Sequence, residues 1–182
     1  MIKKLLTLLL TFSLIFTMTV PAFAADALGS ESTAGFTPQR IFLANEQAPG
    51  GDLKEMLQLL DSEFAAKAIP TAEVMPIVYG SEDLAESGDI VIKISDSAAG
   101  VTADDGYAVE ISDKAVVNAR TSKGAFYGAH EVMKELIKGG GTAEAQSFTE
   151  NPAADMRAVF VDIGRQYYSV EWLESLIKQM AW

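Results

Sequence analysis

The chain has 182 residues, with 14 Lys and Arg against 25 Asp and Glu, which gives a formal net charge of −11. It contains no Cys and one His, which excludes disulfide scaffolds, zinc–thiolate sites and cysteine nucleophiles. An acidic surface repels phosphate backbones, so we expect no nucleic-acid partner, and a content of 49% hydrophobic residues excludes a disordered chain.

Residues 1–24 have the three-part pattern of a secretory signal peptide. Two lysines precede an apolar run over 5–20, and small residues allow cleavage after Ala24. The run is shorter than the roughly 20 residues that a membrane span needs, and no basic stop follows it, which disfavours a transmembrane anchor. We therefore expect a secreted bacterial protein with no membrane span in its mature chain.

The next segments predict a flexible leader over 25–37, rich in small residues, and then a small α/β domain over 38–150. Alternating or β-branched apolar residues predict the strands of this domain. The predicted strands are 40–43, 74–79, 89–94, 107–111 and 115–119, the last two as a hairpin. Pro76 interrupts one of them and predicts that it lies at a sheet edge.

Two helices are predicted in the same domain. The first is capped by Asp52, with Glu55 as its capping-box partner, and stops at Ile69-Pro70. The second is capped by Thr121 or Ser122 and ends at the glycines 139–141. Each helix carries a single apolar stripe, so we expect both to cover one face of an antiparallel or mixed sheet.

A new unit begins after residue 150. Arg157–Ile163 is apolar on both faces, which is typical of a strand buried in a parallel sheet. Ser169 is predicted to cap a following helix. A buried strand needs neighbours on both sides, and this sequence offers none, so we expect 151–182 to be the opening of a larger domain that is truncated at Trp182.

Two stretches of sequence resemble one enzyme family. The Gly-Ala-Phe-Tyr-Gly segment at 124–128 resembles the start of the second helix of the small domain in glycoside hydrolase family 20, the β-N-acetylhexosaminidases. The segment 157–181 resembles the first strand and helix of that family's catalytic barrel. There are two departures: Glu150-Asn151-Pro152 replaces the usual Asp-x-Pro, and Arg157-Ala158 replaces the usual Arg-Gly.

The resemblance implies a specific fold and activity. The fold class is an α+β small domain, with a sheet and two helices on one face, followed by the first β-α unit of a truncated TIM (β/α)8 barrel. The activity is retaining hydrolysis of terminal β-linked N-acetylglucosamine or N-acetylgalactosamine from glycans, assisted by the substrate's own acetamido group. The resemblance implies no metal or organic cofactor.

Among site residues, the resemblance assigns only Arg165, which matches an Arg that donates hydrogen bonds to hydroxyls of the terminal sugar. A planar guanidinium past the carboxyl end of a barrel strand suits this role. In that family the catalytic Asp-Glu pair lies at the end of the fourth barrel strand, so the resemblance implies that it lies beyond this chain. Glu82-Asp83 does not take that role, because it is in the wrong order and in a polar loop. We therefore expect no catalytic residue in these 182 residues and no activity from them alone.

Other candidates have simpler explanations. Asp162 is expected to be buried in its strand and to hold the loop that presents Arg165. His130 borders an apolar stripe, and without a second His or a Cys a metal role is disfavoured. Tyr167 and Tyr168 could stack on sugars, although packing is the commoner use of such residues. Trp172 is expected in the core between helix and barrel.

Two alternative functions remain open. One is an exported, non-catalytic carbohydrate-binding or adhesion module, which needs a natural end at Trp182 and a closed fold without a barrel. The other is a different glycosidase family that shares the small domain, which Gly164-Arg165 disfavours. The reading frame downstream of Trp182 distinguishes these possibilities.

Overall fold

The computed structural model describes residues 35–44, 51–68, 74–154 and 156–181. The predicted signal peptide and most of the predicted leader lie outside these residues. The described strands are β1 (Arg40–Leu43), β2 (Ile77–Tyr79), β3 (Asp89–Ile94), β4 (Tyr107–Ile111), β5 (Ala115–Ala119) and β6 (Gln146–Glu150). The described helices are α2 (Gly51–Ala68), the short 3-10 helix η1 (Glu82–Leu84), α3 (Ser122–Lys138) and α4 (Val170–Ala181).

The six strands form one mixed sheet in the order β2-β1-β3-β5-β4-β6. Strands β2, β1, β3 and β5 pair in parallel, whereas β4 pairs antiparallel with both β5 and β6. The β4–β5 hairpin has the predicted bounds. Strand β2 lies at an edge, as predicted, but it is shorter than the predicted 74–79 and begins only after Pro76. Strand β6 was not predicted from the sequence.

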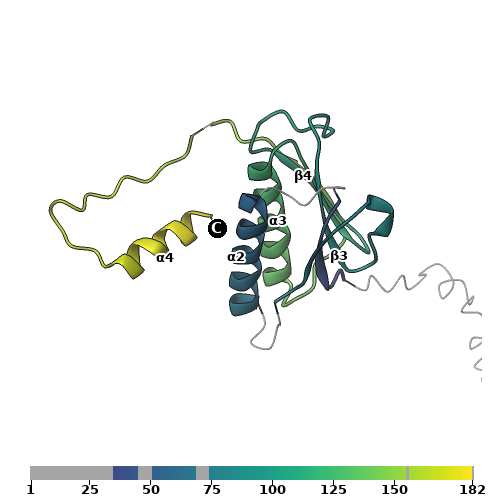
Figure 1. The fold of residues 1–182 in the computed structure, drawn as a ribbon, viewed down its shortest axis with the longest axis horizontal. Helices are drawn as coiled ribbons and strands as arrows, with labels where there is room; N and C mark the ends of the chain where they lie inside the picture. The colour runs from purple at the N-terminus through teal and green to yellow at the C-terminus, as the bar shows by residue number, and fades with distance from the viewer. Residues whose placement is uncertain (1–34, 45–50, 69–73, 155, 182) are drawn as a thin grey trace, which may run out of the picture. The chain divides into compact units, whose positions relative to one another are not determined.

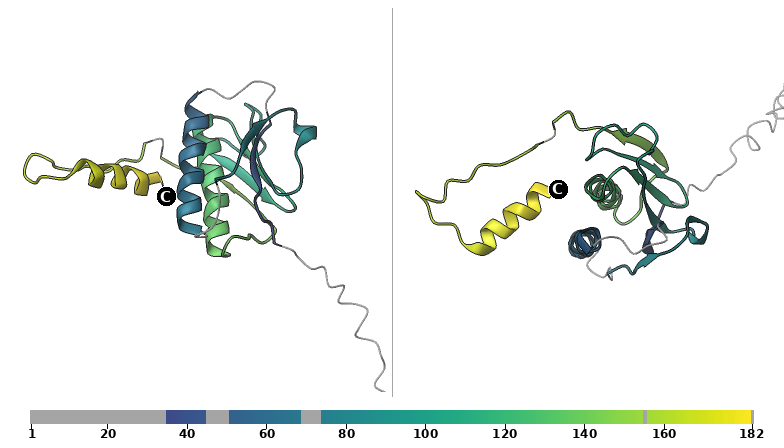
Figure 2. Two further views of the ribbon diagram at one scale, coloured as in Figure 1. Left: turned by 60° about the horizontal axis from the view of Figure 1, so that its bottom comes forward. Right: turned by 45° about the horizontal axis from the view of Figure 1, so that its top comes forward.

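Helices α2 and α3 cover one face of this sheet and lie side by side, as the end-on view of Figure 2 shows. Helix α2 connects β1 to its parallel neighbour β2, and α3 connects β5 to β6 across the sheet. Such connections carry a helix over the sheet because strands running in the same direction cannot be joined by a tight turn. The predicted arrangement of two helices on one face is confirmed.

The core lies between these helices and the sheet. Fully buried side chains of α2 include Leu53, Leu57 and Leu60, and those of α3 include Val132 and Leu136. They pack against alternate sheet residues, which are Ile41, Leu43, Ile90, Ile92, Val109, Ile111, Ala115 and Val117. The stripes read from the sequence are therefore the buried faces of the helices.

Two glycines of the Gly-Ala-Phe-Tyr-Gly segment mark where α3 touches the sheet. A Cβ added at Gly124 would lie 2.3 Å from the carbonyl oxygen of Gly106. A Cβ added at Gly128 would lie 2.4 Å from Cγ1 of Val117. Since real Cβ contacts are never this short, the helix can approach the sheet only without side chains at these two positions.

Helix ends follow the sequence signals in part. Thr121 caps α3, and its hydroxyl accepts a hydrogen bond from the N–H of Gly124 at 3.1 Å. Ser169 accepts one from the N–H of Trp172 at 3.2 Å and so caps α4. The predicted cap Asp52 lies instead inside the first turn of α2, which begins at Gly51. There its carboxylate still faces the positive end of the helix dipole.

The segment Arg157–Ile163 is not a strand in this structure, which corrects the sequence prediction. It forms no ladder with any described strand, and Phe160 is 90% exposed while Val159 is 57% exposed. A strand is defined by hydrogen bonds to neighbours, and apolar composition alone cannot supply them. The described fold is therefore a six-stranded mixed α/β sheet with three α-helices, and it contains no barrel.

The packed domain begins before the predicted boundary at position 38. Phe36 is buried and pairs with Ala143 through backbone hydrogen bonds of 2.8 and 2.9 Å.

None of the helices in the described part of the chain has the length and hydropathy that crossing a membrane requires.

Candidate functional site

The loop before α4 carries the residue that the sequence singled out. Asp162 accepts a hydrogen bond from the N–H of Gly164 at 2.9 Å and another from Nε of Arg165 at 2.6 Å. These contacts to Arg165 and Gly164 lower the pKa of the Asp162 carboxyl below its usual range. The Asp-x-x-Arg segment is therefore a locally closed turn in which the carboxylate holds the guanidinium.

The burial of Asp162 differs from the expectation. Its side chain is 36% exposed, because the segment around it is not enclosed by neighbouring strands. The Arg165 side chain is 90% exposed, and its contact with Asp162 uses Nε. The terminal Nη groups thus remain as donors for an external ligand.

An aromatic pair lies at the start of α4, beside this turn in sequence. Tyr168 and Trp172 stack with ring centroids 4.3 Å apart and an interplanar angle of 26°. Trp172 is 44% exposed, so the prediction that it lies in a core is wrong for this structure. The ring of Tyr168 therefore packs against Trp172 and does not form an open surface on which a sugar could stack. Tyr167 is 87% exposed and has no such partner ring among the described residues.

Side chains of the Asp162–Arg165 turn and of the start of α4 line one cavity of about 560 Å³. Its wall includes Asp162, Arg165 and Gln166 on the polar side and Phe160, Tyr168 and Trp172 on the apolar side. Pockets that bind small polar ligands combine an apolar wall with a few donors and acceptors in this way. The structure therefore brings together Arg165, Asp162 and Tyr168 from the sequence candidates, and it leaves Tyr167 outside the lining.

His130 lies on α3, outside the cavity around Arg165. It is 3% exposed on α3, near the ring of Phe126, and burial lowers its pKa to about 4. A neutral buried imidazole of this kind is a packing residue at physiological pH. Within the described ranges, no group of three or more His, Cys, Asp or Glu side chains could hold a metal ion.

The pair Glu82-Asp83 serves structural contacts. Both residues lie in η1 of the small domain, where Glu82 forms an ion pair of 2.6 Å with Lys93. Asp83 accepts a hydrogen bond from the hydroxyl of Ser81.

Sequence reasoning missed a polar cluster around Asp105. This carboxylate is 3% exposed, and it binds Arg157 at 2.6 Å and Lys123 at 3.4 Å. The guanidinium of Arg157 also lies over the ring of Tyr127, 5.2 Å from its centroid. The contact joins residues 52 positions apart, and no local pattern in the sequence predicts such a pairing.

Comparisons with known proteins extend this description. No protein-family model matches the sequence, and no curated protein matches it significantly. Two of the solved structures that resemble the fold are hexosaminidases. The GH20 β-N-acetylhexosaminidase of Streptomyces coelicolor A3(2) matches 78% of this chain with a TM-score of 0.56 and 13% identity. The N-acetyl-β-hexosaminidase of Streptomyces plicatus, in complex with Thio-NAglucal, matches 80% with a TM-score of 0.52 and 12% identity.

At such identities the likeness is one of fold. The chain spans only 28% of the length of the first enzyme and 29% of the second. The class that the comparison defines is thus a mixed α/β fold that resembles part of family 20 hexosaminidase structures.

Proposed function

We propose that this chain is the N-terminal portion of a secreted β-N-acetylhexosaminidase. The observation that carries the proposal is the fold likeness to two family 20 enzymes over about four fifths of the chain. The Gly-Ala-Phe-Tyr-Gly segment, which resembles the corresponding segment of that family, supports it as well. The signal-peptide pattern over 1–24 supports export.

In this proposal, Arg165 binds the terminal sugar. Its Nε is occupied by Asp162, so the guanidinium is held in one orientation while its Nη groups donate to two adjacent hydroxyls. Asp162 is a positioning residue, because it touches Arg165 and not the sugar. The exposed apolar side chains of 156–163 and α4 would be covered by further β-α units of a barrel.

The chemistry would come from outside these residues. A substrate-assisted, retaining mechanism needs a Glu to protonate the leaving oxygen and an Asp to orient the acetamido group. The sequence has no adjacent Asp-Glu in that order. We therefore expect these 182 residues to bind sugar weakly and to hydrolyse nothing.

The first test uses a chromogenic N-acetylglucosaminide. The 182-residue chain is expected to give no turnover above the buffer rate, and clear turnover would overturn this assignment of the chemistry. The reading frame downstream of codon 182 is expected to encode more β-α units and an Asp-Glu pair. A stop codon there would favour a non-catalytic binding module instead.

The second test addresses Arg165 in the complete reading frame. Arg165→Gln is expected to lower kcat/KM by about tenfold to a hundredfold, since it removes charge-assisted hydrogen bonds to the sugar. Arg40→Gln is the matched control, because that guanidinium binds Asp89 within the sheet, away from the Arg165 loop. Equal losses in both variants would mean that Arg165 acts only on folding.

A further inference from the structure

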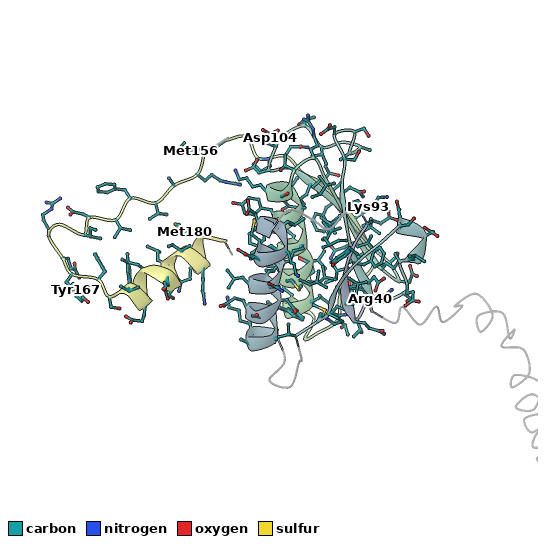
Figure 3. All side chains as sticks on the ribbon, in the orientation of Figure 1. Arg40, Lys93, Asp104, Met156, Tyr167 and Met180 are labelled. Atoms are coloured by element: carbon teal, nitrogen blue, oxygen red, sulfur yellow. The ribbon has the colours of Figure 1, made fainter. Side chains whose placement is uncertain are left out.

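The face of the sheet opposite α2 and α3 carries a row of aligned side chains. The strand register places Lys93 of β3 next to Asn118 of β5, then Ala108 of β4, then Thr149 of β6. Residues of a strand alternate between faces, and the residues that precede this row on the four strands pack into the helix-covered core, namely Ile92, Val117, Tyr107 and Phe148. Figure 3 labels Lys93 on the side of the sheet away from the two helices.

A hollow lies over this row. Ala108 is its shortest side chain, so the centre of the row is lower than its two ends. The loop that follows β3 supplies one wall through Ser95, Ser97 and Ala98. Together they enclose a cavity of about 550 Å³, within the range of volumes that small-molecule sites occupy.

The wall of the cavity is built into the fold. Asn151 accepts hydrogen bonds from the N–H groups of Thr102 and Ala103 at 2.7 and 3.2 Å, and it donates to the carbonyl of Gly100 at 2.9 Å. At the other end of the loop, the N–H of Ser95 bonds to the carbonyl of Ala119 at 2.9 Å. Contacts at both ends preorganise the loop, which lowers the entropy lost on binding.

The chemistry of the lining selects a class of ligand. The side-chain donors and acceptors are mostly uncharged, namely Ser95, Ser97, Asn118, Ser147 and Thr149. Lys93, the single cation of the lining, is already paired with Glu82 at 2.6 Å, and Glu110 is acidic, which disfavours phosphate or another anion. The many hydroxyl and amide groups disfavour an apolar ligand.

We propose that this cavity is a second carbohydrate-binding site, which takes a neutral oligosaccharide. A neutral sugar presents donors and acceptors in equal measure, and the lining offers both without a net positive charge. The site is formed by β3, β4, β5, β6 and the 95–100 loop, and it shares no residue with the cavity around Arg165. It goes beyond the proposed hydrolase function, because it would hold a glycan without acting on it.

The experiment is a titration of the ¹⁵N-labelled chain with the β-1,4-linked trimer of N-acetylglucosamine, followed by amide shifts. Saturable shifts are expected at residues 93–99, 108, 118 and 147–149. Asn118→Ala is expected to weaken binding about tenfold, since it removes the central amide. Ala108→Leu is expected to abolish it by filling the floor, whereas Ala153→Leu, exposed and outside the lining, leaves it unchanged.

Three results would overturn the proposal. One is the absence of saturable shifts up to about 10 mM trimer, beyond which binding is non-specific. Another is saturable shifts confined to 159–176, which would support the Arg165 site alone. The third is displacement of the trimer by inorganic phosphate, which would make this an anion site. If circular dichroism shows that Ala108→Leu does not fold, the trimer affinity of Asn118→Ala tests the proposal, and an unchanged affinity would overturn it.

Discussion

Asp61, on α2, is a buried carboxylate with little compensation. It has no exposed surface, and among the described residues the backbone of Met75 favours its charged form only in part. Burial raises its pKa to about 6, and the backbone of Met75 offsets part of this effect. The charged form is therefore disfavoured in the folded state, and the residue contributes a pH-dependent cost to stability.

The sign of this dependence follows from the direction of the change. The pKa rises from an ordinary 3.8 to about 6 on folding, so the contribution to stability is complete below pH 3.8 and is lost as the pH rises through 6. Ionisation of Asp61 lowers the free energy of unfolding by about 3 kcal/mol between these two pH limits. Asp61→Asn is expected to remove this loss, so the variant becomes increasingly stable relative to the parent from pH 4 to pH 7.

Urea unfolding at a series of pH values measures that difference. The control is Asp52→Asn, which removes an exposed acid from the same helix. A flat difference for Asp61→Asn over this range would mean that burial does not raise the pKa of the Asp61 carboxyl.

The Asp162–Arg165 turn shows what can be read from sequence at this scale. Its donor and acceptor lie three residues apart, so the spacing alone places them within reach. The expected role of Asp162 in holding the Arg165 loop rests on this local contact. The exposure of Asp162 could not be read in the same way, because it depends on which distant strands enclose the segment.

At the scale of the element, α3 depends on the absence of a side chain at Gly128. Gly128→Ala places a Cβ 2.4 Å from Val117 and 3.1 Å from Tyr107. Alanine favours helix by about 1 kcal/mol over glycine, but overpacking of a core costs about 1 to 3 kcal/mol. We expect a net loss of stability and a lower Tm.

Thermal unfolding followed by circular dichroism checks this expectation. Lys138→Ala, at the exposed end of the same helix, is the control and should change Tm far less. An unchanged or higher Tm for Gly128→Ala would show that α3 can move away from the sheet at no cost.

Two strands mark the limit of prediction for elements. Strand β6 reads Gln-Ser-Phe-Thr-Glu, with one apolar residue in five, and only its pairing with β4 defines it. The segment Arg157–Ile163 has the stronger apolar pattern and yet forms no strand. The apolar composition of a segment indicates how strongly its side chains favour burial. A strand also requires a neighbouring strand whose backbone N–H and C=O groups are free to pair with it.

At the scale of the whole chain, Arg157 provides one contact between the segment after β6 and the sheet. It binds the buried Asp105 at 2.6 Å and lies over Tyr127. Arg157→Gln removes both the charge pair and the cation–π contact, while Lys123 still neutralises Asp105. We expect the 156–168 segment to be cleaved several-fold faster by chymotrypsin at Phe160 and Tyr167.

Mass spectrometry of timed digests measures the cleavage rates. Lys93→Gln removes an ion pair of similar length on the sheet and should leave the rates at these two sites unchanged. Equal rates in the parent and in Arg157→Gln would show that Arg157 does not restrain this segment.

The sequence by itself determined the local order of this protein: the bounds of four strands, the apolar faces of α2 and α3, the cap Ser169, the choice of Thr121 or Ser122 as the cap of α3, and the spacing of Asp162 and Arg165. Each of these depends on residues within a few positions of one another, where spacing dictates geometry. Only the tertiary structure decided the strand order, the pairing of β6, the Asp105 cluster and the hollow over Ala108. These features join residues that are distant in sequence, and their partners are set by packing across the sheet.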